Sequence, residues 1–267
     1  MLQRILSVDL GNSRCKLRWW NAARDGSPPL ATLDLPSRDA SLAPLHAWLT
    51  LLDAAPEHVC VVVSSVAGTS RTQDVVCTLD ARFPGCVLAP PNAGLIVECR
   101  PIEGVGSDRL FAARGAWERA RRPCLIVDAG TALTVDAVDA LSAHGRVTGR
   151  FLGGAIAPGP ELVADALHAG TARLPRVSLI TDPAPIGRST DAALQSGIVL
   201  GFRGAARELV ARIASAAGLD TAPVVLTGGA RGFLLAPSVF GDRGVIEDAE
   251  LVHVGLLAAA RAHAGIP

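Results

Sequence analysis

Two stretches of this chain follow one plan, and their repetition limits the possible folds more than any other feature. "SVDLGNSRCKLRWW" (7–20) and "IVDAGTALTVDAVD" (126–139) each run from an apolar strand through Asp-X-Gly and two small residues into a second strand. Their aspartates, Asp9 and Asp128, stand nearly half the chain apart. The repeat predicts two similarly built halves, 1–120 and 121–267, that meet across a cleft.

Short β-branched runs alternate with longer Ala-, Leu- and Arg-rich segments, a pattern typical of an α/β protein. Strands are expected at 5–10, 16–20, 58–66, 85–89, 124–130, 133–140 and 222–230. Helices are expected at 42–55, 70–83, 108–121, 158–174, 190–218 and 249–264. Glycine turns are expected within 151–159 and at 226–230.

Charge and cysteine usage restrict the partners and the compartment. The chain has 25 basic and 25 acidic residues, so nothing points to nucleic acid or a membrane surface as the main partner. Asp9 interrupts the N-terminal apolar run too early for a signal peptide, and no stretch reaches the roughly 18 apolar residues of a membrane span. Reduced thiols and a cytoplasmic location are expected, because no C-x-x-C joins the scattered Cys15, Cys60, Cys77, Cys86, Cys99 and Cys124.

The first acid–glycine turn has the residue types of a phosphate loop. Asp9 at a strand end suits a hydrated magnesium ion, and Gly11 lets backbone N–H groups point at phosphate oxygens. Asn12 and Ser13 add short donors, and Lys16, the only lysine, could reach an outer phosphate. A β-hairpin whose Asp and Asn satisfy turn hydrogen bonds explains these residues equally well.

Two familiar nucleotide motifs are disfavoured. The residue immediately before the single lysine is not glycine, so the G-x-x-x-x-G-K-[ST] phosphate loop is excluded. "GVGSDR" (104–109) ends in Arg and follows no expected strand, which argues against a dinucleotide fingerprint.

Three further segments carry candidate functional groups. In "GVGSDRLF" (104–111), Asp108 could accept a proton from a substrate hydroxyl and Arg109 could bind a carboxylate or phosphate. An acid in the first helical turn is also an ordinary partner of the helix dipole. Gly228 and Gly229 of "LTGGA" suit an adenine or ribose against bare backbone, with tight packing as the alternative. "IGRSTDAALQSG" (186–197) opens a helix whose N-cap is Ser189 or Thr190.

In this order the motifs resemble type III pantothenate kinase, a family of the acetate and sugar kinase/Hsp70/actin superfamily. Six motifs carry the resemblance over nearly the whole chain: "DLGNSRCK", "GSDR", "DAGTA", "GGAIAPG", "STDAALQSG" and "TGGA". The resemblance implies an actin-like ATPase fold, in which two ribonuclease-H-like halves have mixed sheets flanked by helices. It also implies ATP-dependent phosphorylation of pantothenate to 4′-phosphopantothenate, the first step of coenzyme A biosynthesis. A homodimer that uses Mg2+ and a monovalent cation, K+ or NH4+, is implied as well.

The resemblance further implies roles by motif position. The expected ATP contacts are Asp9, Leu10, Gly11, Asn12, Ser13, Arg14, Cys15, Lys16 and Thr131, with Asp9 near the magnesium. The expected pantothenate contacts are Gly106, Ser107, Asp108, Arg109 and Thr190, with Asp108 as the proton acceptor. Asp128 falls where relatives hold the monovalent cation. Cys99 stands where relatives have a tyrosine that touches pantothenate, so the pocket wall is expected to differ there.

Two other functions stay open on the sequence. One is a different small-molecule kinase or hydrolase of the same superfamily, acting on a sugar or acetate; the G-x-D-R turn and the short chain count against it. The other is a nucleotide-binding regulator of transcription. Neutral net charge and the lack of a recognisable DNA-reading helix argue against direct nucleic-acid binding.

Overall fold

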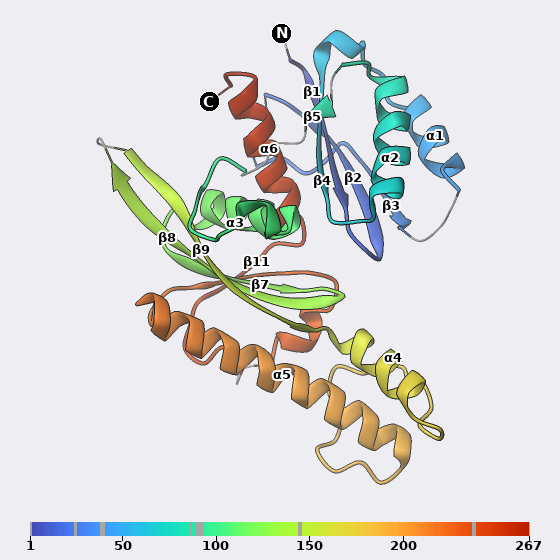
Figure 1. Cartoon of the computed structure of the whole chain (residues 1–267), viewed down its shortest axis with the longest axis vertical. Helices are drawn as coiled ribbons and strands as arrows, with labels where there is room; N and C mark the ends of the chain where they lie inside the picture. Colours follow the sequence, from blue (N-terminus) through green and yellow to red (C-terminus); the bar gives the residue numbers. More distant parts are fainter. Residues whose placement is uncertain are drawn as a thin grey trace. The chain divides into compact units, whose positions relative to one another are not determined.

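The computed structural model describes residues 2–23, 26–37, 41–85, 87–88, 93–143, 146–236 and 239–266 (Figure 1). These residues divide into two units, of which the first joins Met1–Arg119 to Leu251–Pro267 and the second is Ala120–Glu250. The break after residue 119 lies next to the division expected at residue 120. The C-terminal segment differs from the expectation, since it groups with the first unit, where its helix packs on two strands of the sheet.

Unit 1 is built on a mixed sheet whose strands lie in the order β3-β2-β1-β4-β5. Strands β1, β2 and β3 are antiparallel neighbours, whereas β4 runs parallel to both β1 and β5. Their bounds are Arg4–Leu10 for β1, Arg14–Asn21 for β2, Ala31–Pro36 for β3, Val59–Ser65 for β4 and Val87–Leu88 for β5.

Helices cover both faces of this sheet (Figure 1). One face carries α1 (Ala43–Thr50) and α2 (Thr69–Arg82), which share a buried core with Leu6, Val8 and Leu10. Because side chains alternate along a strand, Ser7 points to the other face. There α6 (Leu251–His263) covers the sheet, and its His253 Nδ1 lies 2.8 Å from Ser7 Oγ.

Helix α3 (Ser107–Ala120) packs against α6 at a glycine crossing. A Cβ at Gly115 would overlap the Leu251 carbonyl, and a Cβ at Gly255 would overlap the Phe111 carbonyl. The two backbones therefore touch directly, which side chains larger than hydrogen would prevent.

Unit 2 is a second mixed sheet, with strands in the order β11-β10-β7-β8-β9. Strand β8 is antiparallel to β7 and β9, and β10 is parallel to β7 and β11. The strands are Cys124–Ala129 (β7), Ala132–Ala143 (β8), Arg146–Pro158 (β9), Val224–Thr227 (β10) and Val245–Glu247 (β11). The helices are Pro160–Gly170 (α4) and Thr190–Ala217 (α5).

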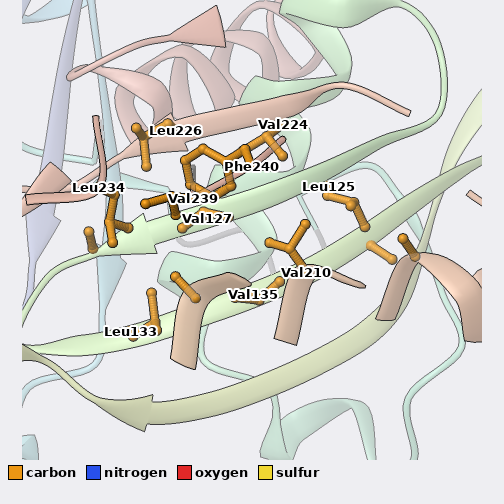
Figure 2. Close-up of a cluster of buried hydrophobic side chains, with 14 of the residues drawn as sticks. Leu125, Val127, Leu133, Val135, Val210, Val224, Leu226, Leu234, Val239 and Phe240 are labelled. Atoms are coloured by element: carbon orange, nitrogen blue, oxygen red, sulfur yellow. The ribbon is translucent and has the colours of Figure 1, made fainter. Parts of the chain in front are cut away.

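The long helix α5 closes the core of unit 2. Phe202, Ala206, Val210 and Ala214 recur every four residues along α5 and are buried, so they form one face of the helix. Figure 2 shows this core, in which strand residues such as Leu125, Val127, Leu133, Val135, Val224 and Leu226 gather with Val210.

Both units place their repeated aspartate in the same local arrangement. Asp9 on β1 lies between an antiparallel partner, Lys16, and a parallel partner, Ser64. Asp128 on β7 likewise lies between Thr134 on the antiparallel side and Thr227 on the parallel side. This agreement supports the internal repeat inferred from the sequence.

Several expected elements need correction. The glycine turn predicted within 151–159 is instead strand, because β9 continues to Pro158 and Gly154 pairs with Asp136 in the β8–β9 ladder. A Cβ at Gly154 would lie 2.5 Å from Asp136 Oδ1, so this glycine serves close strand pairing. The helix expected to reach residue 55 ends at Thr50. Cys86 and the end of the strand predicted at 85–89 lie outside the described residues.

The remaining short elements were not anticipated from the sequence. They are β3 and β11, the two-residue β6 (Ile96–Val97), and the 3-10 turns Pro56–His58, Ile102–Gly104 and Arg231–Leu234. Among the helices that the structure describes, none is both long and apolar enough to cross a membrane.

Candidate functional site

The first acid–glycine turn is a tight β-hairpin between β1 and β2. Gly11 N–H donates to the Arg14 carbonyl at 2.9 Å, which closes the turn. Ser37 N–H donates to the Ser13 carbonyl at 3.0 Å and ties the tip to the end of β3. Asn12, Ser13 and Arg14 are exposed at the hairpin tip. The hairpin and phosphate-loop interpretations are therefore compatible, since a hairpin presents the donors.

Lys16 sits on β2 between two acids on neighbouring strands. It pairs with Asp9 across to β1 and with Asp34 across to β3. Directly opposed residues on neighbouring strands project to the same face, so the ammonium group has acidic neighbours on both sides. Asp34 also accepts from Arg18 Nη1 at 2.5 Å. The lone lysine is thus held within a charged row on the sheet face that α6 covers.

Two expected ATP contacts have side chains in the core. Leu10 and Cys15 are buried on the α1/α2 face of the sheet. Burial raises the pKa of the Cys15 thiol to about 12, and the nearby Asp9 charge adds to the rise. The thiol is therefore neutral at physiological pH, and these two residues offer a ligand only their backbone groups.

The "GSDR" turn is attached to the same edge of the sheet by hydroxyl groups. Ser107 Oγ lies 2.8 Å from Ser64 Oγ, accepts from Ser65 N–H at 3.1 Å and donates to the Ser65 carbonyl at 3.1 Å. Since Ser64 pairs with Asp9, these bonds place the N-terminus of α3 next to the β1–β2 hairpin. Ser107 is one of the expected substrate contacts, and in this structure its hydroxyl bonds to Ser64 and Ser65 of β4.

The carboxyl group of Asp108 is affected by its burial in this turn. Burial raises its pKa above the ordinary value of 3.8, and the hydrogen bond that its Oδ1 accepts from Arg109 N–H at 2.8 Å opposes the rise. A Cβ on Gly106 would lie 2.5 Å from Asp108 Oδ1, so glycine leaves room for the carboxylate. A partly buried carboxylate with a raised pKa is a suitable proton acceptor.

The second acid–glycine turn gathers backbone from three segments of unit 2. Ala230 N–H donates to the Ala129 carbonyl at 2.7 Å, and Gly159 N–H donates to the Thr131 carbonyl at 3.0 Å. Gly228 has φ +92°, and a Cβ there would overlap both Ala129 O and Asp128 Oδ1. Gly228 therefore packs directly against the Ala129 carbonyl and the Asp128 carboxylate, in a conformation that favours glycine.

Gly159 is a site residue that the sequence reading missed. A Cβ there would overlap the carbonyls of Gly130 and Thr131. Gly159 is the last glycine of "GGAIAPG", a segment that was expected to form a separate turn.

Three other expected site residues take no part in the contacts described above. Gly229 is exposed, and a Cβ there would meet nothing within 4 Å. Cys99 is partly exposed, and Thr190 is exposed at the first turn of α5. Ser189, not Thr190, is the N-cap of α5, since its Oγ accepts from Ala192 N–H at 3.2 Å.

The geometry of each unit supports binding of a polyanion. Each turn presents a carboxylate and a small hydroxyl at the carboxyl end of a central strand, and unit 1 adds Lys16 and Asp108, whose pKa is raised. No cluster of three or more metal-ligating side chains occurs among the residues described. A metal ion here would take most of its ligands from water and from the ligand's own oxygens.

Comparison with known proteins agrees with these features. The family described as "Type III pantothenate kinase" matches residues 5–212. A type III pantothenate kinase of Ruegeria pomeroyi is 33% identical over 93% of this chain and 94% of its own length. One from Moorella thermoacetica is 42% identical over 67% of this chain and 68% of its own length.

Among solved structures, the fold is similar to the inorganic polyphosphate/ATP-glucomannokinase of Arthrobacter sp. strain KM. The TM-score is 0.52 with 13% identity, and the match covers 98% of both chains. At that identity the likeness concerns the fold alone, which is the actin-like ATPase fold of mixed sheets flanked by helices.

Proposed function

This chain belongs to the type III pantothenate kinase family, and we propose that its two acid–glycine turns bind ATP while the Gly106–Arg109 turn binds pantothenate. Family membership makes it an enzyme that uses ATP to phosphorylate pantothenate to 4′-phosphopantothenate in coenzyme A biosynthesis. The observation that carries the site assignment is the Ser64–Ser107 hydroxyl pair, because it joins the phosphate hairpin to the turn that bears Asp108.

Asp108 is the proposed proton acceptor. Phosphoryl transfer depends on positioning and charge stabilisation, so the protein must orient the attacking hydroxyl and remove its proton. The raised pKa makes Asp108 a better acceptor than an exposed aspartate. Arg109, adjacent to it, supplies a guanidinium group for the carboxylate of pantothenate.

The first turn suits Mg2+, which proteins usually hold with one or two carboxylates beside the phosphates of a substrate. Asp9 is partly exposed at a strand end, where its carboxylate would hold a hydrated magnesium ion beside the phosphates of ATP. Magnesium bound there would neutralise charge on the phosphates. The polar groups of the hairpin tip would orient the phosphate oxygens.

A monovalent cation fits the second turn. Asp128 Oδ1 and the Ala129 carbonyl both lie beside Gly228, and carboxylate and carbonyl oxygens are hard ligands suited to K+ or NH4+. Thr131, exposed at the same turn, and the backbone at Gly228 and Gly229 are the proposed ATP contacts of unit 2.

A homodimer in the cytoplasm completes the proposal. Unit 2 exposes large apolar side chains around α4 and α5, among them Leu162, Ile180 and Ile186, which a second copy would cover. The described cysteines are free thiols, as expected in a reducing compartment. Thr190 at the start of α5 is retained as a proposed pantothenate contact, and Cys99 as part of the pocket wall.

A coupled kinase assay tests the function and the cation together. We expect ATP consumption with pantothenate but not with acetate or hexoses, and a lower rate when Na+ replaces K+. Equal rates in the two salts would remove the cation from the proposal. Activity with a hexose and none with pantothenate would overturn the assignment of the acceptor.

Lys16→Ala tests the phosphate role of the lone lysine. Loss of a charged contact of roughly 1.5–3 kcal/mol should raise the KM for ATP about tenfold to a hundredfold and leave the KM for pantothenate unchanged. Steady-state kinetics with each substrate varied in turn measure both constants. The control is Arg212→Gln on α5, which removes an exposed cation that pairs with Glu208 one turn away on the same helix. An unchanged KM for ATP would show that Lys16 is only a strand residue.

A further inference from the structure

We propose that Arg71 is a second cationic contact for the phosphates of ATP, an inference that rests on the function proposed above. Arg71 lies in the first turn of α2 and is partly buried. Its guanidinium Nε is buried and has no hydrogen-bond partner among the described residues. A buried N–H group of a charged side chain is costly to leave unpaired, so this group fits an anion that the protein chain does not supply.

The backbone brings Arg71 to the edge of the sheet that carries the phosphate hairpin. Ser65, the last residue of β4, is in register with Leu10, the last residue of β1. Val66 N–H donates to the Leu10 carbonyl at 3.0 Å, so the chain leaves β4 alongside the end of β1. It then reaches α2 within a few residues, and α2 begins at this edge.

Hydroxyl groups keep the first turn of α2 in place. Ser65 Oγ lies 2.7 Å from Oγ1 of Thr72, the residue after Arg71. Ser65 Oγ also accepts from Ala67 N–H at 3.3 Å, and the Ser65 backbone is bonded on both its N–H and its carbonyl to Ser107. The segment that carries Arg71 is therefore linked to the turn that carries Asp108.

The charge of Arg71 acts on β2, the second strand of the hairpin. Cys15, the second residue of β2, is affected by the charges of both Asp9 and Arg71, which act in opposite directions. Cys15 directly follows the exposed residues of the hairpin tip, so the charge of Arg71 acts on the residue next to the tip.

The chemistry of the ligand follows from these neighbours. A guanidinium group presents planar N–H donors that match the oxygens of phosphate, and it stays charged at all working pH values. Lys16 acts from the α6 side of the sheet, while Arg71 comes from the α2 side. Two cations from opposite faces would hold the phosphate chain over the hairpin, which one flexible lysine cannot do.

Arg71→Gln and Arg71→Lys, with Arg212→Gln as the matched control, test the proposal. We expect Arg71→Gln to raise the KM for ATP about tenfold to a hundredfold, with the KM for pantothenate unchanged. Arg71→Lys keeps the charge without the planar fork and should recover part of the loss. In calorimetry without pantothenate, ATP and ADP should bind Arg71→Gln more weakly than wild type, whereas adenosine should bind equally.

The outcomes separate this inference from the proposed function. An unchanged KM for ATP, or a rise confined to the KM for pantothenate, overturns the phosphate contact. If the wild-type protein fails to phosphorylate pantothenate, the proposed function falls, while the ATP, ADP and adenosine titrations still test Arg71. Equal melting temperatures of the variants exclude unfolding as the cause; if Arg71→Gln does not fold, the same comparison is made with Arg71→Lys.

Discussion

Asp108→Asn is expected to lower turnover by roughly 10²–10⁴-fold, the usual contribution of a positioned acid or base. Asparagine keeps the shape of the side chain and can still accept the Arg109 N–H bond, but it cannot take a proton. The KM for ATP should change little, because the hairpin donors are untouched. Steady-state kinetics at saturating pantothenate measure the loss.

The melting temperature of Asp108→Asn should distinguish a catalytic base from an acid that only stabilises the fold. Burial raises the pKa of Asp108, which means that its ionised form is disfavoured in the folded state. Removing the charge should therefore leave the melting temperature unchanged or raise it. The control is Glu161→Gln, which neutralises an exposed acid in the first turn of α4. Near-normal turnover in Asp108→Asn would leave Asp108 as a helix-dipole partner only.

The pH dependence of turnover follows from the raised pKa of Asp108. The active form of Asp108 is the carboxylate, so the rate should fall as the pH is lowered through the folded pKa, which lies above 3.8. Between the unfolded and the folded pKa the native state binds more protons, so this group's effect on stability is to favour folding as the pH falls. The acid limb of the profile should disappear in Asp108→Asn.

Gly255→Ala is expected to destabilise the protein by at least about 1–3 kcal/mol, the range for overpacking a close contact. The added Cβ would overlap the carbonyl of Phe111, which is backbone in the middle of α3 and cannot move aside alone. The two helices must separate, and α3 carries Asp108 at its N-terminus. Thermal and urea unfolding measure the loss.

A glycine in an open position provides the control. Gly201 lies within α5, and a Cβ there would meet nothing within 4 Å. Gly201→Ala should be neutral or stabilise by roughly 0.5–1 kcal/mol, because alanine favours helix. Equal stability of Gly255→Ala and wild type would show that the α3–α6 crossing tolerates an added methyl group.

Much of the fold could be predicted because its signals are local. The strands at β1, β4, β7 and β10 are apolar runs next to glycine, and the long helices have clear periodicity. Strand β9 was mistaken for a turn because its glycines look like turn residues in the sequence. Gly154 is needed for close pairing with β8, which depends on a neighbour in space and cannot be recognised from the segment alone.

The candidate site likewise contains residues that the sequence identified and residues whose place only the structure showed. The sequence alone identified the two acid–glycine turns, Lys16 and the "GSDR" turn, because each consists of consecutive residues whose chemistry is local. Only the tertiary structure assigned Ser107 to β4, turned Cys15 into the core and brought Arg71 to the hairpin edge. Those outcomes depend on strand register and helix packing between distant segments, and such long-range pairings leave no mark in the spacing of neighbouring residues.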